Sequence, residues 1–113
     1  MSPTCLFCKI VRKEIPAQII AEDEHCIAFR DISPQAPVHV LIVPREHVDS
    51  LADAKDATAL GRVLLMAAEV ARAERITDGG YRTVLNTNAG AGQTVFHLHA
   101  HVLGGRKMTW PPG

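Results

Sequence analysis

Residues 97–102 alternate between imidazole and aliphatic side chains, which predicts a β-strand with two unlike faces over residues 96–103. One face carries His97, His99 and His101, and the other carries Leu98, Ala100 and Val102, which point to the core. Successive histidines on one face stand roughly 6.6 Å apart, at about 3.3 Å per residue. That spacing is too long for direct hydrogen bonds among all three, but it suits a groove lined with imidazoles. Because imidazole serves as a nucleophile, an acid–base group or a metal ligand, a metal site and a covalent histidine site both remain open.

The rest of the chain predicts an α+β fold. Apolar residues recur at helical spacing from Asp56 to Arg75, which predicts one long helix. Thr4 can cap a short helix that ends before Pro16. We expect the long helix to cover one face of an antiparallel sheet of five strands. The predicted strands are residues 18–21, 26–31, 39–43, 81–86 and 96–103.

Length and composition predict one cytoplasmic domain. The 113 residues leave room for a single domain, residues 1–113. Lys+Arg and Asp+Glu balance at 12 each, so no excess charge points to a nucleic acid or to an anionic membrane as a partner. The apolar runs are too short to cross a bilayer, and the N-terminus lacks the apolar stretch of a signal peptide. The odd number of cysteines, three, argues against a disulfide framework and for the cytoplasm.

A small, polar loop precedes the histidine strand. Residues 86–94 read Asn-Thr-Asn-Ala-Gly-Ala-Gly-Gln-Thr, and the glycines let backbone N–H groups approach an anion closely. Such loops are usually only turns, and this one lacks the lysine of a P-loop. Because the loop lies directly before the histidines, it suggests a phosphate held beside an imidazole.

Several motifs resemble the histidine-triad (HIT) superfamily. The run from His97 to His101, followed by Val102 and Leu103, resembles the signature of that superfamily. Further segments resemble its HINT branch, and the last of them, which ends in Trp-Pro-Pro-Gly, is the most specific: residues 7–10, 14–17, 28–39, 44–47 and 104–113. The resemblance covers nearly the whole chain. It implies a HIT-like fold whose sheet extends across a homodimer, through the strand at residues 81–86 and the long helix.

The resemblance implies a purine nucleoside phosphoramidase of the adenosine 5'-phosphoramidate type. His99 would attack the α-phosphorus, and water would then release a nucleoside monophosphate from the nucleotidyl-histidine. The backbone carbonyl of His97 would orient His99, while His101 and His39 would form a supporting pair near the phosphate. Thr94 completes the implied catalytic set and stands where the family often has serine. No catalytic metal is expected.

The resemblance also implies a nucleotide-binding set. Asp31 would accept hydrogen bonds from the ribose hydroxyls, although the residues alone favour a cap for the turn before Ser33. Apolar side chains would enclose the base, although the residues alone fit a core. Arg30 stands where the branch often has histidine. The full set is Phe7, Ile10, Phe29, Asp31, Ile32, Asn86, Gly92, Gln93, Thr94, Val95, His99 and His101.

Cys5 and Cys8 form a C-x-x-C motif with three interpretations: a redox pair, half of a zinc site, or chance. A redox motif normally lies in a thioredoxin-like βαβ unit, which the predicted elements lack. A zinc site needs two further ligands. In zinc-containing relatives of the superfamily those ligands occupy the positions of His47 and His97, so the resemblance implies a structural zinc. Cys26 lies in a predicted strand and fits core packing.

Other functions remain open beside the phosphoramidase. Within the same class, the chain fits a dinucleoside polyphosphate hydrolase or a nucleotide phosphorylase. From a different class, it fits a nucleotide-binding interaction module with incidental activity. A metal-dependent hydrolase is disfavoured, because histidines at i, i+2 and i+4 of a straight strand diverge poorly around a metal with bonds of ~2.1 Å. The stiff, apolar tail at residues 110–113 would dock near the leaving-group pocket of a partner subunit.

Overall fold

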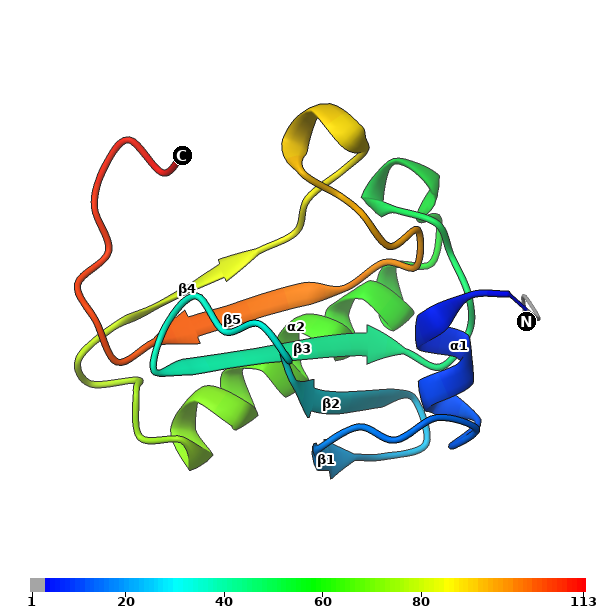
Figure 1. Ribbon diagram of the computed structural model, residues 1–113, viewed down its shortest axis with the longest axis horizontal. Helices are drawn as coiled ribbons and strands as arrows, with labels where there is room; N and C mark the ends of the chain where they lie inside the picture. The colour runs from blue at the N-terminus through cyan, green and yellow to red at the C-terminus, as the bar shows by residue number, and fades with distance from the viewer. Residues whose placement is uncertain (1–3) are drawn as a thin grey trace.

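The computed structural model describes residues 4–113, which form a five-stranded antiparallel sheet in the order β1-β2-β3-β5-β4 (Figure 1). The strands are β1 (Ile19–Glu22), β2 (Cys26–Arg30), β3 (Val38–Pro44), β4 (Tyr81–Val84) and β5 (Ala100–Gly104). The described residues also form the α-helices α1 (Leu6–Val11) and α2 (Ala57–Ala73) and the 3-10 helices η1 (Leu51–Asp53) and η2 (Ala89–Ala91). The predicted α+β class, with five strands, one long helix and one short helix, is confirmed.

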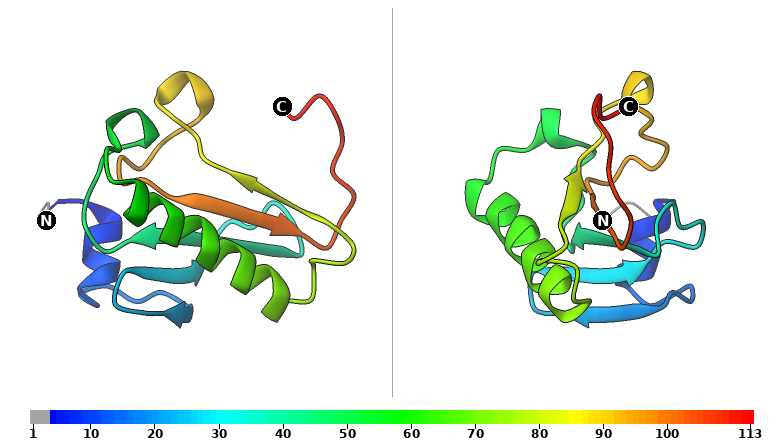
Figure 2. Two further views of the ribbon diagram at one scale, coloured as in Figure 1. Left: turned by 180° about the vertical axis from the view of Figure 1, so that it is seen from behind. Right: turned by 90° about the vertical axis from the view of Figure 1, so that its left-hand side faces the viewer.

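Helix α2 covers one face of the sheet, as Figure 2 shows from two sides. Asp56 begins the helix, because its side chain accepts hydrogen bonds from the backbone N–H groups of Thr58 and Ala59 at 3.0 and 3.1 Å. Such a cap contributes about 1 kcal/mol. The apolar stripe of α2 packs on even-numbered residues of β2, β3 and β5. This layer of the core includes Ala28, Ile42, Val63, Ala67, Val70, Ala100 and Val102.

The opposite face of the sheet packs against α1. Phe7, Ile10 and Val11 of that helix form a second core with odd-numbered residues of the central strands, among them Phe29 and Leu41. Since side chains alternate along a strand, the odd-numbered residues His39 of β3 and His101 of β5 lie on this same face. The sheet therefore separates the α2 core from the face that carries the histidines.

Strand β5 begins later than predicted, and Pro44 gives the reason. Ile42 pairs with Ala100, so two residues further along the same register Pro44 would lie opposite Leu98. Proline has no N–H to donate, and Leu98 instead donates its N–H to the carbonyl of Val48 at 2.7 Å. The predicted strand over residues 96–103 is therefore wrong in its first four residues. The alternation of side chains nevertheless persists, because Leu98 packs in the α2 core while Phe7 contacts His97 and His99.

Two smaller predictions are also corrected. The predicted strand over residues 81–86 ends at Val84. The cap of the first helix is Cys5 rather than Thr4, because Sγ of Cys5 accepts a hydrogen bond from the backbone N–H of Cys8 at 3.4 Å. The same Sγ atom also lies 3.4 Å from Nδ1 of His97.

The C-terminal residues extend away from the sheet beyond the end of β5 (Figure 1). Arg82 of β4 donates to the carbonyl of Thr109 at 3.0 Å, and its guanidinium lies 5.9 Å from the ring centre of Trp110. The Trp110 side chain is nevertheless 81% exposed. Within residues 4–113, no helix has the length and apolar character needed to cross a membrane.

Candidate active site and metal centre

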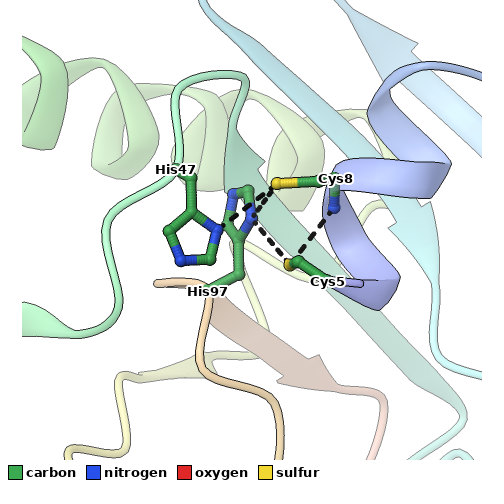
Figure 3. Close-up of side chains that lie close together, drawn as sticks. All are labelled: Cys5, Cys8, His47 and His97. Carbon is green, nitrogen blue, oxygen red and sulfur yellow. Dashed lines mark hydrogen bonds between the residues drawn. The ribbon is translucent and has the colours of Figure 1, made fainter. Parts of the chain in front are cut away.

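Four potential metal ligands meet beside the start of α1 (Figure 3). Cys5 and Cys8 come from the cap and first turn of α1, His47 from the loop after β3, and His97 from the segment before β5. Nδ1 of His97 lies 3.4 Å from Sγ of Cys5 and 3.5 Å from Sγ of Cys8, and Nδ1 of His47 lies 3.3 Å from Sγ of Cys8. All four ligand atoms lie within 4.8 Å of one another. The structure thus brings together the four residues that the sequence predicts as zinc ligands.

Hydrogen bonds on the far side of both imidazoles decide which nitrogen faces the sulfurs. Nε2 of His97 donates to the carbonyl of Pro44 at 2.8 Å, and Nε2 of His47 donates to Oδ1 of Asp49 at 2.6 Å. Because a carbonyl and a carboxylate only accept, the neutral rings carry their proton on Nε2 and present a lone pair on Nδ1. Oxygen acceptors of this kind orient metal-bound histidines in general. Burial lowers the pKa of His97 to about 4, which keeps its ring neutral.

The donor set fits tetrahedral zinc. Zn–S bonds of about 2.3 Å and Zn–N bonds of about 2.1 Å, at tetrahedral angles, put sulfur and nitrogen roughly 3.6 Å apart. The sulfur–nitrogen contacts of the cluster, at 3.3 to 3.5 Å, are close to that value. Two thiolates and two imidazoles would fill all four positions, as in structural zinc sites. The cluster could therefore bind a metal such as zinc.

The ring of His99 is held by the backbone of His97. Nδ1 of His99 donates to the carbonyl oxygen of His97 at 2.8 Å, so the neutral ring carries its lone pair on Nε2. The side chain is buried, with 8% exposed, and its ring centre lies 5.0 Å from that of Phe7 in an edge-to-face contact. Burial lowers the pKa of His99 below its usual value, so Nε2 is unprotonated at neutral pH. An oriented, unprotonated imidazole is suited to nucleophilic attack.

His39 and His101 form a hydrogen-bonded pair beside His99. The backbone N–H of Gln35 donates to Nδ1 of His39 at 3.0 Å, and this leaves the proton of His39 on Nε2. That nitrogen lies 2.9 Å from Nδ1 of His101, which therefore accepts. The proton of neutral His101 is accordingly on Nε2. The ring centres of His99 and His101 are 4.9 Å apart, so the proton-bearing ring lies next to the ring with the lone pair.

Asp31 lies at the edge of this histidine pair. Its Oδ2 is 3.5 Å from Nε2 of His39, while its Oδ1 accepts from the backbone N–H of Ser33 at 2.8 Å. The turn-capping role that the residues alone favour for Asp31 is therefore observed. By position, Asp31, His39 and His101 could also hold a cation. The side chain of His97, in contrast, faces the cysteine cluster, and only its backbone carbonyl contacts His99.

The predicted base contacts divide between the core and the surface. Phe7, Ile10 and Phe29 are at most 6% exposed and belong to the core between α1 and the sheet. Ile32, next to Asp31, is 100% exposed. Phe7 is the member of the core that also contacts the His99 ring.

Gln93 maintains the shape of the loop before the histidines. Its Nε2 donates to the carbonyls of Asp49 at 2.8 Å and Val95 at 3.1 Å, and its Oε1 accepts from the backbone N–H of Asn88 at 2.7 Å. These hydrogen bonds use both amide hydrogens and the amide oxygen of Gln93, so its side chain supports the loop and ties it to the segment after β3. The other predicted contacts in this loop are exposed or half-buried: Asn86, Gly92, Thr94 and Val95.

The site contains supporting groups that the sequence analysis did not single out. Asp49 orients His47, and in the sequence its carboxylate two residues after a candidate histidine ligand indicates such a partner. The carbonyl of Pro44 and the N–H of Gln35 are backbone groups, which give no side-chain signal. Cys26 lies in the core as predicted, with 1% exposed, and burial raises the pKa of its thiol to about 11.

Comparison with known proteins gives matches over almost the whole chain. The HIT domain matches residues 12–108. An uncharacterized HIT-like protein of Synechococcus elongatus is 51% identical over 115 residues, which cover 100% of both chains.

Solved structures agree with this sequence match. A HIT family hydrolase from Legionella pneumophila superimposes with a TM-score of 0.95 at 51% identity, over 97% of this chain and 100% of the other. A HIT family hydrolase from Clostridium thermocellum superimposes with a TM-score of 0.94 at 45% identity, over 96% of each chain. The sheet of five antiparallel strands with one long helix is therefore a HIT fold.

Proposed function

The chain belongs to the HIT domain family, and on that premise we propose that it hydrolyses purine nucleoside phosphoramidates with His99 as the nucleophile. One observation carries the proposal: Nδ1 of His99 donates to the carbonyl of His97 at 2.8 Å, which leaves the Nε2 lone pair for attack. The Legionella and Clostridium relatives are both described as hydrolases. Within the family we assign the chain to the HINT-like branch on the segment 104–113.

The reaction proceeds in two displacements at one phosphorus atom. Nε2 of His99 attacks the α-phosphorus, a phosphorus–nitrogen bond to the ring forms, and the bond to the amine leaving group breaks. The amine takes up a proton from the solvent as it leaves. Water then attacks the same phosphorus and returns a proton to the solvent, the bond from phosphorus to Nε2 breaks so that Nε2 regains its lone pair, and the nucleoside monophosphate is released. His101, with its proton on Nε2, donates a hydrogen bond to the phosphoryl group or the leaving nitrogen.

The nucleotide is held by the residues around this pair of rings. Asp31 accepts from the ribose hydroxyls, and the hydroxyl of Thr94 contacts the leaving group. Asp31 is already beside His39, 3.5 Å from its Nε2, which supports this position for the sugar. The remaining proposed contacts are Phe7, Ile10, Phe29 and Ile32 for the base and Asn86, Gly92 and Val95 for the phosphate side, where Gln93 supports the loop that carries them.

A direct test uses His99→Ala with His25→Ala as a matched control, since His25 lies in the turn between β1 and β2 and belongs to neither the proposed catalytic set nor the cysteine cluster. The His99 variant should lose turnover of an adenosine phosphoramidate by about 10³-fold or more while it still binds AMP. Wild-type protein and His25→Ala should form a labelled phosphorus–histidine adduct in an alkaline quench, and His99→Ala should not. A His99→Ala protein that keeps more than a few per cent of the rate would refute the covalent mechanism.

We also propose a structural zinc held by Cys5, Cys8, His47 and His97. When bound, the ion crosslinks α1, the loop after β3 and the segment before β5. A closed set of four protein ligands leaves no position for a substrate, so the proposed role is stability rather than chemistry.

We further propose a homodimer that joins β4 of two chains. Strand β4 is an edge of the sheet and pairs with β5 alone among the described strands. An open edge is a template for pairing with another strand. Helix α2 adds exposed apolar surface, with Leu64 44% and Leu65 67% exposed.

A further inference from the structure

The turn after β5 and the loop between β2 and β3 meet at one end of the sheet, where Val38 pairs with Gly104. Gly105 has a positive φ of 86°, and a Cβ at this position would lie 2.9 Å from Cβ of Pro37. Only glycine allows so close an approach without a shift of either segment. The close contact directs the next residue, Arg106, toward the loop.

Arg106 holds the backbone of that loop. Its Nε donates to the carbonyl of Gln35 at 3.0 Å. Gln35 is otherwise exposed, in a loop without regular secondary structure between two prolines, and its side-chain amide donates to the carbonyl of Ser33. The Arg106 contact therefore fixes the carbonyl side of Gln35 to the segment after β5, and a charged donor makes such a bond stronger than a neutral one.

Gln35 in turn determines where the protons of the histidine pair lie. Its backbone N–H donates to Nδ1 of His39 at 3.0 Å, and Nε2 of His39 donates to Nδ1 of His101 at 2.9 Å. If the Gln35 N–H moved away, Nδ1 of His39 could carry the proton instead. The pair could then reverse, with Nδ1 of His101 donating, and Nε2 of His101 would become an acceptor.

We propose that Arg106 is a positioning residue, which acts through the backbone of Gln35 to keep Nε2 of His101 a hydrogen-bond donor. The inference rests on the proposed function, in which that donor faces the substrate. Asp31 also favours a proton on Nε2 of His39, with its Oδ2 at 3.5 Å, but it holds the start of the loop and not Gln35. Arg106 thus holds Gln35, whereas Asp31 holds Ser33.

The test compares Arg106→Ala and Arg106→Lys with Lys107→Ala. Lys107 is the exposed neighbour, so its removal controls for the loss of one positive charge near an anionic substrate. Proteins labelled with ¹⁵N at histidine are studied without ligand, because two-bond ¹H–¹⁵N spectra distinguish protonated from unprotonated ring nitrogens. The His39 signals are assigned with His39→Gln, and the same proteins are assayed for kcat and KM.

Wild-type protein and Lys107→Ala should show His39 protonated at Nε2 only. Arg106→Ala should show a mixture of both tautomers, a kcat about tenfold lower and a KM changed by less than about threefold. Arg106→Lys should lie between them, because an ammonium can also donate to the Gln35 carbonyl, and it serves as the test if the alanine variant does not fold.

Two results would overturn the proposal. One is a single, wild-type His39 tautomer in the Arg106 variants, even if they melt at a lower temperature, since that outcome assigns Arg106 a purely structural role. The other is an unchanged kcat despite a mixed tautomer. A wild-type protein that cleaves no phosphoramidate would refute the proposed function, while the NMR comparison still decides whether Arg106 positions His39.

Discussion

The carbonyl oxygen of His97 lies 2.8 Å from Nδ1 of His99, while the imidazole of His97 faces Sγ of Cys5 and Sγ of Cys8. One residue therefore belongs to both sites: its side chain is a candidate metal ligand, and its backbone orients the candidate nucleophile. Any change that moves His97 is expected to affect both stability and the orientation of His99.

The metal cluster gives the first prediction. Wild-type protein purified without a histidine tag should contain about one zinc per chain, and Cys5→Ser combined with Cys8→Ser should abolish zinc binding. The double variant should melt about 10 °C lower, which corresponds to roughly 2–3 kcal/mol for a domain of this size. Elemental analysis and thermal unfolding provide the two measurements.

Cys26→Ala is the control for this prediction, because it removes a buried thiol that lies in the α2 core and outside the cluster. It should retain zinc whatever it does to the melting temperature. Wild-type protein that contains no zinc, or that loses zinc without any change in stability, would contradict the structural role.

The faces of the histidine segment could be predicted from the sequence, whereas its hydrogen bonds could not. A period of two assigns His97, His99 and His101 to one side regardless of where the strand begins. The start of β5 depends on register, because the ladder stops where Leu98 would meet Pro44. Register is a property of two segments 54 residues apart, so the local pattern of neither segment reveals it.

The ligands of the metal cluster also could not be predicted from a local sequence pattern alone. The C-x-x-C motif alone left three interpretations, and only the resemblance supplied His47 and His97 as further ligands. Cys5 and His97 are separated by 92 residues in the chain, and their contact depends on how α1 packs on the sheet. The contacts of Gln35 and Arg106 involve backbone atoms, which leave no trace in a sequence pattern.

The histidine pair gives a prediction about pH. Burial is the main reason that the pKa of His101 falls to about 4, and the neighbouring rings of His99 and His39 lower it further, while Asp31 raises it. An unfolded histidine titrates near ~6.5. Between pH 6.5 and 4 the unfolded chain therefore binds more protons, so the free energy of unfolding should fall as the pH falls. The loss due to His101 should be on the order of 1–2 kcal/mol at pH 5.

Denaturant unfolding at pH 7.5 and pH 5.0 measures this effect. The comparison is made in the Cys5→Ser, Cys8→Ser background, with and without His101→Gln, so that acid release of bound zinc does not contribute and the difference between the two proteins isolates His101 from the other buried histidines. The glutamine should flatten the pH dependence. Equal slopes with and without His101 would show that another group is responsible.

The open edge of the sheet predicts a dimer in solution. Sedimentation at micromolar concentration should give twice the chain mass of 12.3 kDa. Leu65→Glu should shift the protein toward monomer, because it adds a charge to an apolar residue that is 67% exposed on α2. Leu51→Glu, at a leucine that is 42% exposed on η1, is the matched control and should remain dimeric. A wild-type monomer under these conditions would exclude the proposed assembly.

The C-terminal tail gives the last prediction, which rests on the contact between Arg82 and the segment of Thr109 and Trp110. Arg82 holds the base of the tail, yet the Trp110 ring remains 81% exposed on the single chain. A large apolar ring in water is unfavourable, so a docking position against a second chain, near its leaving-group pocket, would bury it. Deletion of residues 109–113 should therefore change the order of preference among phosphoramidate leaving groups, as measured by kcat/KM. Trp110→Ala should change the order in the same direction.

The two tail variants should still form the dimer and the labelled adduct on His99, since neither step uses the tail. Arg82→Ala, which releases the tail without shortening it, should produce a smaller change of the same kind, because an exposed cation–π contact contributes only about 0.5–1 kcal/mol. Iodide quenching of Trp110, the one tryptophan of the chain, reports on docking directly: quenching should be weak in the wild-type dimer and stronger in Arg82→Ala. An unchanged substrate order in the truncated protein, with Trp110 fully open to iodide in the wild type, would exclude a role for the tail in selecting the leaving group.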